Sequence, residues 1–589
     1  MTRTRNVADI IKQPFTTTLG TSNYRAGVNA GNSIASGGNF NTVVGDEAGT
    51  AINTGDYNTA FGFQAGDAIN TSSYNTAVGA KSATAIAAGQ RNSAFGYGAL
   101  QTDTVGGRAV ALGFNALGTQ NFTSATDNYN IGVGYDAGGA ITTGVQNTLI
   151  GSFAGDSLTD ADYNLAVGQG AVGSDTLGSR STGLGYGALA NQNFTSATDT
   201  GNTAVGYEAG LSVTTGTNNT LIGGLAGDAI TDGNTNVAVG SSSLSANQRG
   251  DRNTAAGYKA LEVMNPSGDV DTYNTAFGFS AGRAITTGTS NTFVGGEAGD
   301  GTDDGVNNVA VGKSALSANC GDNNTAVGEA ALAVATGANN QCFGNGAGSA
   351  ITSGNYNTIL GQYTGNQGGL DIRTSSNNLV LADGQGNPRV HVLSSGNMFV
   401  GRAQESTWQE GFGVESVGSG SAGTYLITAH KSGVASGRPY QYFFLNNAVI
   451  GAIIQSGTNG VAYNTSSDYR LKENVVYDWD ATTRLKQLKP ARFNFIADGT
   501  DVTQDGFMAH EAQEVVPIAV SGTKDAMKDE DYEITSAVLD DDGVEITAAV
   551  MGTRRAIDGQ GIDHSLLVPL LVKTIQELEA RITILESGE

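Results

Sequence analysis

Short apolar triplets, separated by glycine, asparagine and small polar residues, repeat along most of the chain. The repeated unit is Asn-Thr-Ala-Val-Gly or a close variant, followed by a loop of small residues, as at Asn58–Gly62, Asn202–Gly206 and Asn291–Gly295. The closing glycine recurs at one constant interval at Gly45, Gly62, Gly79, Gly96 and Gly113. A fixed period of this kind is typical of stacked repeats. The pattern therefore predicts a mainly β shaft of stacked coils over residues 36–365.

Three of the repeats are four residues longer than their neighbours. They recur regularly, so that the closing glycines Gly113, Gly185 and Gly257 are again equally spaced, with four repeats in each interval. The segment Gln120–Asp127 returns unchanged as Gln192–Asp199, which indicates block duplication. Because insertions in stacked repeats are placed in loops on one face, we expect the extra residues to form a surface loop in one coil of four.

Each repeat holds two short β-prone pieces, for example Thr220–Ile222 and Ala229–Thr231. Glycine and asparagine between the pieces tolerate the left-handed backbone of tight corners. Small inward alanines let strands approach closely, and stacked asparagines can form amide ladders along the axis. A coil this thin buries little by itself, so we expect neighbouring coils or partner chains to cover it, and three chains around a common axis would do so. The pattern resembles the head repeats of trimeric adhesins, which implies a trimeric β-roll or β-solenoid.

Composition and charge exclude several classes of function. The formal net charge is −25, which disfavours partners with phosphate backbones and argues against nucleic acid as a partner. No apolar stretch approaches the roughly 20 residues needed to span a bilayer, so no membrane insertion is expected. The only two cysteines, Cys320 and Cys342, make neither a disulfide framework nor a zinc site, and both are expected to be buried. We predict no metal and no cofactor.

The N-terminal segment 1–35 is the one basic stretch, with Arg3, Arg5, Lys12 and Arg25. It resembles the start of short-tailed phage fibres, which implies attachment to tail proteins of the virion. It leads into no apolar signal-peptide core, so we expect assembly in the host cytoplasm.

Residues 366–466 change character and predict a distal β domain. Asn378–Gly384 and Arg389–Leu393 alternate like the strands of a hairpin. Trp408 and the aromatic run Tyr440–Phe444 could stack on sugars or could belong to the core. Because the repeats are near-copies that suit a spacer, we expect host recognition in 366–466.

The C-terminal part carries the most specific motifs. The segment Ser467–Asn474 has the sequence SDYRLKEN, and further motifs follow at Leu488–Phe495, Gly506–Glu514 and Ile562–Leu571. In order and spacing these motifs resemble the intramolecular chaperone domain of phage tailspikes and fibres, the type first associated with endosialidases. The resemblance covers 467–589 and implies an α+β domain that trimerises, templates the upstream stalk and then cuts itself off.

The resemblance also implies the chemistry of that cut. It places the cleaved bond between Ser466 and Ser467, with Ser467 as nucleophile and Lys472 as its general base. A hydroxyl is a poor nucleophile at neutral pH, and a lysine can take its proton if burial lowers the lysine pKa. His510 and Glu511 are accessory candidates that could orient the site, bind the neighbouring stalk or make only a structural hydrogen bond.

A helix is predicted at the C-terminus. Its apolar residues alternate steps of three and four, as in the seam of a coiled coil: Val568, Leu571, Ile575, Leu578, Ile582 and Leu585. Such a tail would hold three chains together and raise their effective concentration.

Taken as a whole, the sequence predicts a homotrimeric phage tail fibre or tailspike of the virion that binds a host surface glycan or protein receptor. An alternative is a tailspike that also degrades the host polysaccharide, which would need paired carboxyl groups about 5–10 Å apart. A non-phage adhesin is opposed by the missing export signal and membrane anchor.

Overall fold

The computed structural model divides the chain into two compact units. The N-terminal unit comprises Met1–Phe443 and Ala452–Tyr463, and the C-terminal unit comprises Phe444–Gly451 and Asn464–Glu589. The structure describes residues 20–400, 411–416, 424–429, 439–445, 448–456, 460–465, 472–496, 503–535, 538–539, 545–547 and 550–588.

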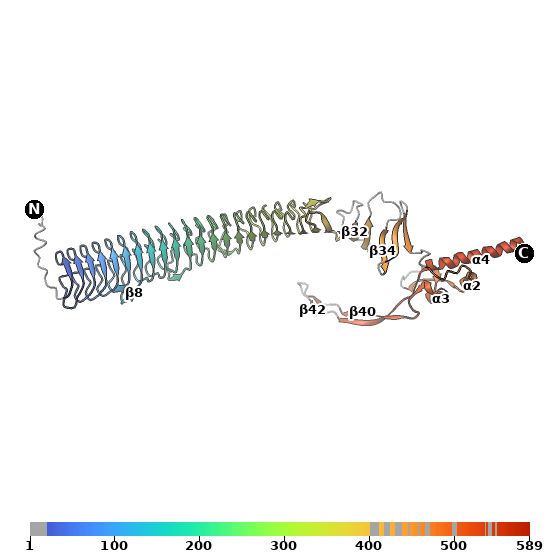
Figure 1. The fold of residues 1–589 in the computed structure, drawn as a ribbon, viewed down its shortest axis with the longest axis horizontal. Coiled ribbons are helices and arrows are strands. Elements are labelled where there is room, and N and C mark those ends of the chain that lie inside the picture. Colours follow the sequence, from blue (N-terminus) through green and yellow to red (C-terminus); the bar gives the residue numbers. More distant parts are fainter. Residues whose placement is uncertain are drawn as a thin grey trace. The chain divides into compact units, whose positions relative to one another are not determined.

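The N-terminal unit is dominated by a β-solenoid of about 21 turns, as predicted. Each turn contributes one short strand, and successive strands pair in parallel without any shift of register, as Thr59–Phe61 does with Thr76–Val78 (Figure 1). At the usual spacing between strands the stack is about 100 Å long. The solenoid strands are β1 (Tyr24–Ala26), β2 (Thr42–Val44), β3 (Thr59–Phe61), β4 (Thr76–Val78), β5 (Ser93–Phe95), β7 (Val110–Leu112), β9 (Ile131–Val133), β10 (Thr148–Ile150), β11 (Leu165–Val167), β13 (Thr182–Leu184), β15 (Thr203–Val205), β16 (Thr220–Ile222), β17 (Val237–Val239), β19 (Thr254–Ala256), β21 (Thr275–Phe277), β22 (Thr292–Val294), β23 (Val309–Val311), β24 (Thr325–Val327), β25 (Gln341–Phe343), β26 (Thr358–Leu360) and β29 (Leu379–Ala382).

The solenoid extends beyond 36–365 at both ends. β1 and β29 depart from the Asn-Thr-Ala-Val-Gly pattern, yet each pairs in parallel with the neighbouring coil. Arg25, one of the four basic residues of 1–35, lies in β1 and donates from Nη1 to the carbonyl of Gly31 at 2.9 Å. Arg3, Arg5 and Lys12 lie outside the described residues.

Each coil closes its core within one chain. The middle residue of each strand points inward, and small side chains such as Ala60, Ala77 and Ala94 are fully buried beside the isoleucines Ile52 and Ile69. The inward alanines are therefore confirmed. Of the two expected ways to cover a thin coil, the structure shows the first: neighbouring coils of the same chain cover its core, and packing against partner chains stays a prediction.

Only one of the two β-prone pieces in each repeat is a strand. Thr220–Ile222 forms β16, whereas Ala229–Thr231 lies in turns and bends. The side chain of Ile230 is fully buried, but its N–H donates to the carbonyl of Gly227 at 3.1 Å within the same coil. The second piece therefore fills the core without forming a strand, and only Thr231 at its end exchanges backbone hydrogen bonds with the neighbouring coils.

The closing glycines allow the coils to approach each other. Gly79 has a φ of +126°, and a Cβ at this position would lie 2.6 Å from the carbonyl oxygen of Gly96 in the next coil. Both the left-handed backbone and the short approach require glycine. The regular recurrence of these glycines is thus imposed by the spacing of the coils.

An asparagine ladder runs through the solenoid, as predicted. Asn219 is fully buried; its Nδ2 donates to the carbonyl of Gly233 at 2.8 Å, and its Oδ1 accepts from the N–H of Asn236 at 2.9 Å. The first bond closes the coil and the second joins it to the next one. Related bonds recur along the shaft from Asn41 to Asn378.

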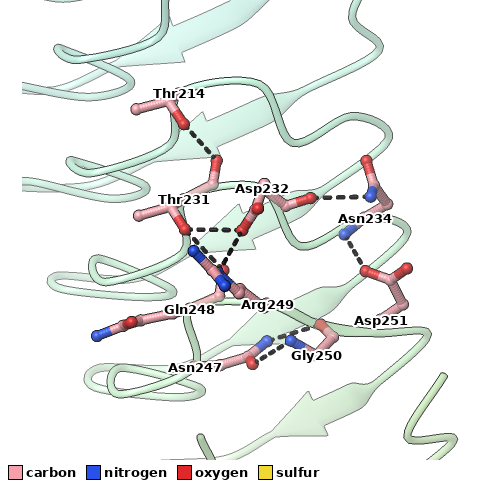
Figure 2. A network of polar contacts seen from close by, with 9 residues as sticks. All are labelled: Thr214, Thr231, Asp232, Asn234, Asn247, Gln248, Arg249, Gly250 and Asp251. Carbon is pink, nitrogen blue, oxygen red and sulfur yellow. Dashed lines mark hydrogen bonds and ion pairs between the residues drawn. The ribbon is translucent and has the colours of Figure 1, made fainter. Parts of the chain in front are cut away.

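Side chains nearer the surface also bond from coil to coil. In Figure 2, Thr214 donates from Oγ1 to the carbonyl of Thr231 at 3.0 Å, and Thr231 donates to that of Gln248 at 3.2 Å. The N–H of Asn234 donates to Asp251 Oδ1 at 2.6 Å. Repeated polar positions therefore hold neighbouring coils in register.

The two cysteines are free thiols buried in the shaft, as expected. Burial raises the pKa of both Cys320 and Cys342. This keeps them protonated at neutral pH and favours the role of small core residues.

Each of the three longer repeats adds a two-stranded parallel side sheet to the shaft. The pairs are β6 (Gly106–Gly107) with β8 (Thr126–Asp127), β12 (Gly178–Ser179) with β14 (Thr198–Asp199), and β18 (Gly250–Asp251) with β20 (Val270–Asp271). A further side sheet near the end of the solenoid is antiparallel and consists of β27 (Asn366–Gln367) and β28 (Leu370–Asp371).

After β29 the pairing becomes antiparallel. β30 (Pro388–Val392) pairs with β29, as the predicted hairpin requires, and β31 (Met398–Val400), β32 (Gly411–Ser416) and β33 (Thr424–Ala429) continue the same sheet. β34 (Pro439–Leu445), β35 (Ala448–Ser456) and β36 (Gly460–Thr465) form a separate three-stranded sheet. Trp408 lies outside the described residues, and for Tyr440–Phe444 only the backbone of β34 is described.

The C-terminal unit combines short helices with small antiparallel sheets. Its core is formed by Ala481, Leu488, Ala512, Val515, Val516, Ala519, Leu567 and Leu570. Its elements are α2 (Ala481–Leu485), β37 (Pro490–Phe493), β38 (Gln504–Phe507), α3 (Ala509–Val515), η3 (Pro517–Ala519), β39 (Val520–Ser521), β40 (Met527–Thr535), β41 (Val538–Leu539), β42 (Glu545–Thr547), β43 (Val550–Ile557), β44 (Gly561–Ile562), η4 (His564–Leu567) and α4 (Val568–Ser587).

Candidate functional site

The segment with the predicted cleavage chemistry leads into the first helix of the C-terminal unit. Ser466 and Ser467 lie outside the described residues, so the Ser467–Lys472 pairing stays a prediction. Lys472 is described and is exposed in the single chain. The chain continues without regular structure to Asp480, whose side chain accepts from the N–H of Thr483 at 2.9 Å and caps α2.

α2 is held by side chains and carbonyls that come from later elements. Glu577 of α4 accepts hydrogen bonds from the N–H of Ala481 at 3.0 Å and of Thr482 at 2.8 Å, and from the Thr482 hydroxyl at 2.6 Å. Arg484 donates from Nε to the carbonyl of Val515, at the end of α3, at 2.8 Å. The segment that follows Lys472 is thereby fixed to both α3 and the C-terminal helix.

These contacts make Glu577 electrostatically unusual. Its side chain is 22% exposed. The hydrogen bond from the Ala481 N–H, followed by those from Thr482, lowers the pKa of Glu577 to about 2. A carboxylate that accepts several N–H and O–H bonds is stabilised in its charged form. Glu577 therefore stays ionised and holds α2 at any pH near neutrality.

The two accessory candidates lie side by side on α3. His510 and Glu511 are both half-buried, and Glu511 pairs with the ammonium of Lys489 at 3.3 Å. This ion pair supports the structural alternative for Glu511. A role in cleavage stays a prediction for both residues.

The entry to α4 is built by a short capped turn. Asp563 accepts from the N–H of Ser565 at 2.9 Å and from its hydroxyl at 2.6 Å, which caps η4. These bonds lower the pKa of Asp563. The ring of His564 lies against Phe507 with a centroid distance of 6.3 Å. The motif Ile562–Leu571 thus positions the start of the helix against the core.

The predicted seam of α4 is exposed in the single chain. Only Leu570 and Thr574 of this helix are buried, and they face the core of the unit. The seam residues are all exposed: Val568, Leu571, Ile575, Leu578, Ile582 and Leu585. An apolar stripe of this length on a helix is typical of a surface that packs against other helices.

Residues 467–521 match the family model described as chaperone of endosialidase. No curated protein and no solved structure matches the chain. With the β-solenoid, this match fits a phage tail fibre or tailspike that carries a C-terminal chaperone, and the family implies a self-cleaving chaperone peptidase domain.

The match to the chaperone family begins at Ser467, directly after the bond predicted to be cut. It includes α2, β37, β38 and α3, and it ends with β39 at Ser521. Glu577 lies outside the matched segment, and sequence reasoning missed it. It stands between two seam residues of α4 and acts on a helix far earlier in the chain, so no local signal could reveal it.

Two other properties concern all of the described residues. No group of three or more His, Cys, Asp or Glu side chains there could hold a metal ion. Within the same residues, no helix is long and apolar enough to cross a membrane.

Proposed function

We propose that the protein is a homotrimeric phage tail fibre that attaches the virion to a host surface glycan or protein. The chaperone domain would trimerise the chains, template the shaft and leave by cleavage between Ser466 and Ser467. The observation that carries the proposal is the family match from Ser467 onwards, directly downstream of a β-solenoid. Residues 1–35 would dock into the virion tail.

The exposed seam of α4 supports a trimer. A second apolar surface supports it along the shaft, where the third residue of many strands points outward and is large and exposed. These residues are Phe61, Phe95, Leu112, Ile150, Ile222, Val239, Phe277, Val294, Val311, Phe343, Leu360 and Leu381. Stacked rings such as Tyr97 and Phe114, 5.3 Å apart, border them. A stripe of this kind favours burial against other chains.

The proposed cleavage is an acyl transfer followed by hydrolysis. Ser467 Oγ attacks the carbonyl carbon of Ser466 while Lys472 takes the hydroxyl proton. The peptide C–N bond breaks, the amine of Ser467 receives a proton, and an ester remains between the two residues. Water then hydrolyses the ester, which releases 467–589 and regenerates the hydroxyl.

The exposure of Lys472 suggests when this reaction occurs. A lysine acts as a base near neutral pH only if its pKa is lowered, and burial is the usual cause. Because Lys472 is exposed in the single chain, we infer that partner chains bury it. Cleavage would then follow trimerisation, so that the chaperone leaves only after the chains are joined.

The test is intact-mass spectrometry of the expressed full chain. We expect one fragment ending at Ser466 and one beginning at Ser467. Ser467→Ala and Lys472→Ala should each leave an uncut chain of full mass, while Lys524→Ala, which changes an exposed lysine of the same unit, should still cut. Cleavage of both Ser467→Ala and Lys472→Ala at the same bond would refute the Ser-Lys assignment.

A further inference from the structure

The inserts in the three longer repeats each place an arginine-aspartate pair at the same position on the surface. Each insert ends on an aspartate at the end of its side sheet, and this aspartate pairs with an arginine shortly before the solenoid strand. The pairs are Arg108 with Asp127 at 2.9 Å, Arg180 with Asp199 at 2.6 Å, and Arg252 with Asp271. The three arginines are equally spaced in the sequence and hold the same place in their coils.

A tyrosine from a neighbouring coil completes each cluster: Tyr129 and Tyr273 come from the coil after their arginines, and Tyr163 comes from the coil before Arg180. The guanidinium carbon of Arg108 lies 5.4 Å from the ring centre of Tyr129, that of Arg180 lies 5.8 Å from Tyr163, and that of Arg252 lies 5.5 Å from Tyr273. The three tyrosines are exposed. Each cluster therefore presents a donor group, an acceptor group and an aromatic ring together at the surface.

In the first two inserts, buried side chains other than the ion pairs anchor the loop. In the first insert, Gln120 donates to the buried Asp103 at 2.6 Å, and the ring of Phe122 is buried beneath the loop. The second insert repeats this arrangement with Gln192 and Asp175, 2.5 Å apart. The arginines and their aspartates are exposed, and exposed ion pairs contribute only about 0–1 kcal/mol. Stability alone therefore does not account for a cluster that appears three times.

The chemistry of the cluster fits a sugar. A guanidinium beside a carboxylate offers donors and acceptors that match neighbouring hydroxyls, and an exposed tyrosine offers an apolar surface with a polar tip. Each Arg-Asp pair is neutral as a whole, whereas the chain carries a net charge of −25. A neutral ligand is therefore favoured over a polyanion, which the field of the whole protein would repel.

We propose that these three clusters are binding sites for a neutral polysaccharide that lies along the shaft. Successive clusters are separated by four coils, which is about 19 Å, so one polymer can reach all three. Each site alone is weak, and simultaneous binding raises the overall affinity. The proposal rests on the proposed role in host attachment and adds the shaft to the distal domain as a contact surface.

The test uses the full-length protein and a panel of immobilised neutral polysaccharides, dextran and galactomannan among them, with alginate as the anionic member. The variant carries Arg108→Ala, Arg180→Ala and Arg252→Ala together. The matched control is Arg91→Ala, because Arg91 lies 5.7 Å from the ring of Tyr74 in a coil without an insert. We expect retention on a neutral member, a loss of about 100-fold or more in the triple variant, and no change in the control.

Three results would overturn the proposal: no neutral polysaccharide is retained, only alginate is retained, or the triple variant binds like the parent. Replacing Tyr129, Tyr163 and Tyr273 by serine tests the same sites without touching the ion pairs. Trimer mass and cleavage are measured on the same samples. If these are intact while binding fails, the polysaccharide sites are refuted and the proposed fibre assembly stands.

Discussion

The exposed seam of α4 predicts that one substitution there disrupts assembly while a neighbouring one does not. Ile582 lies in the seam and is 53% exposed, whereas Ile584 lies outside it and is 56% exposed. Aspartate at either position removes the same apolar side chain from the same helix. We expect Ile582→Asp to prevent trimer formation and Ile584→Asp to leave it unchanged.

The size of the effect follows from the area that a trimer would cover. Full burial of an isoleucine stabilises by about 1.5–3 kcal/mol, so covering the exposed half of Ile582 contributes about 1 kcal/mol per chain and about 3 kcal/mol per trimer. Three carboxylates gathered in an apolar seam add desolvation and repulsion. Since about 1.4 kcal/mol corresponds to a factor of ten, the trimer dissociation constant should rise by at least about 100-fold.

The assay is light scattering after size exclusion, with intact-mass spectrometry on the same fractions. If cleavage follows trimerisation, Ile582→Asp should accumulate as uncut chain, and Ile584→Asp should be cut as completely as the parent. The reasoning is refuted if both variants form trimers equally well. If Ile582→Asp is cleaved but remains monomeric, cleavage does not depend on trimerisation, and the inference that partner chains bury Lys472 is refuted.

Two further predictions concern the hydrogen bonds that hold each unit. Asn219→Ala leaves the buried carbonyl of Gly233 and the N–H of Asn236 without their partner. Denaturant titration should show a free energy of unfolding that is lower by about 2–6 kcal/mol. The control Thr220→Ala, which removes an outward side chain of the same coil, should lower it by less than about 1 kcal/mol. Glu577 has a pKa of about 2 in the folded protein, below its ordinary value of 4.5. Its contribution to the free energy of unfolding is therefore present above pH 4.5 and is lost as pH falls towards 2. The protection factor of the Ala481 amide, which corrects for the pH dependence of intrinsic exchange, should therefore fall across that range in the parent, whereas in Glu577→Gln it should already be lower at neutral pH and change little on acidification.

The sequence was most informative at positions that carry the same type of residue in every repeat. The inward alanines, the closing glycines and the asparagine ladder follow from positions that recur once in each repeat, and the structure confirms them. The second β-prone piece was misjudged because propensity cannot show that the N–H of Ile230 is taken by Gly227 in its own coil. Glu577 could not be predicted, since its partners come from packing between distant segments. Ser467 and Lys472 rest on a family resemblance and remain predictions.

Because neighbouring coils of one chain cover each core, an assembly domain would act on the alignment between chains and not on the folding of a single shaft. Each coil contacts mainly the coils directly before and after it, so a single shaft can fold by propagation from any coil once one has formed. The difficulty in a trimer of such shafts is register, because near-identical coils would allow one chain to slip by a whole coil with little change in contacts. The three inserts, spaced by four coils, restrict such slips only partly. A domain that joins the three chains at one fixed point would exclude all of these slips by a whole coil. We therefore infer that the chaperone acts mainly on alignment between chains, and that its release is harmless once the outward apolar stripes have met.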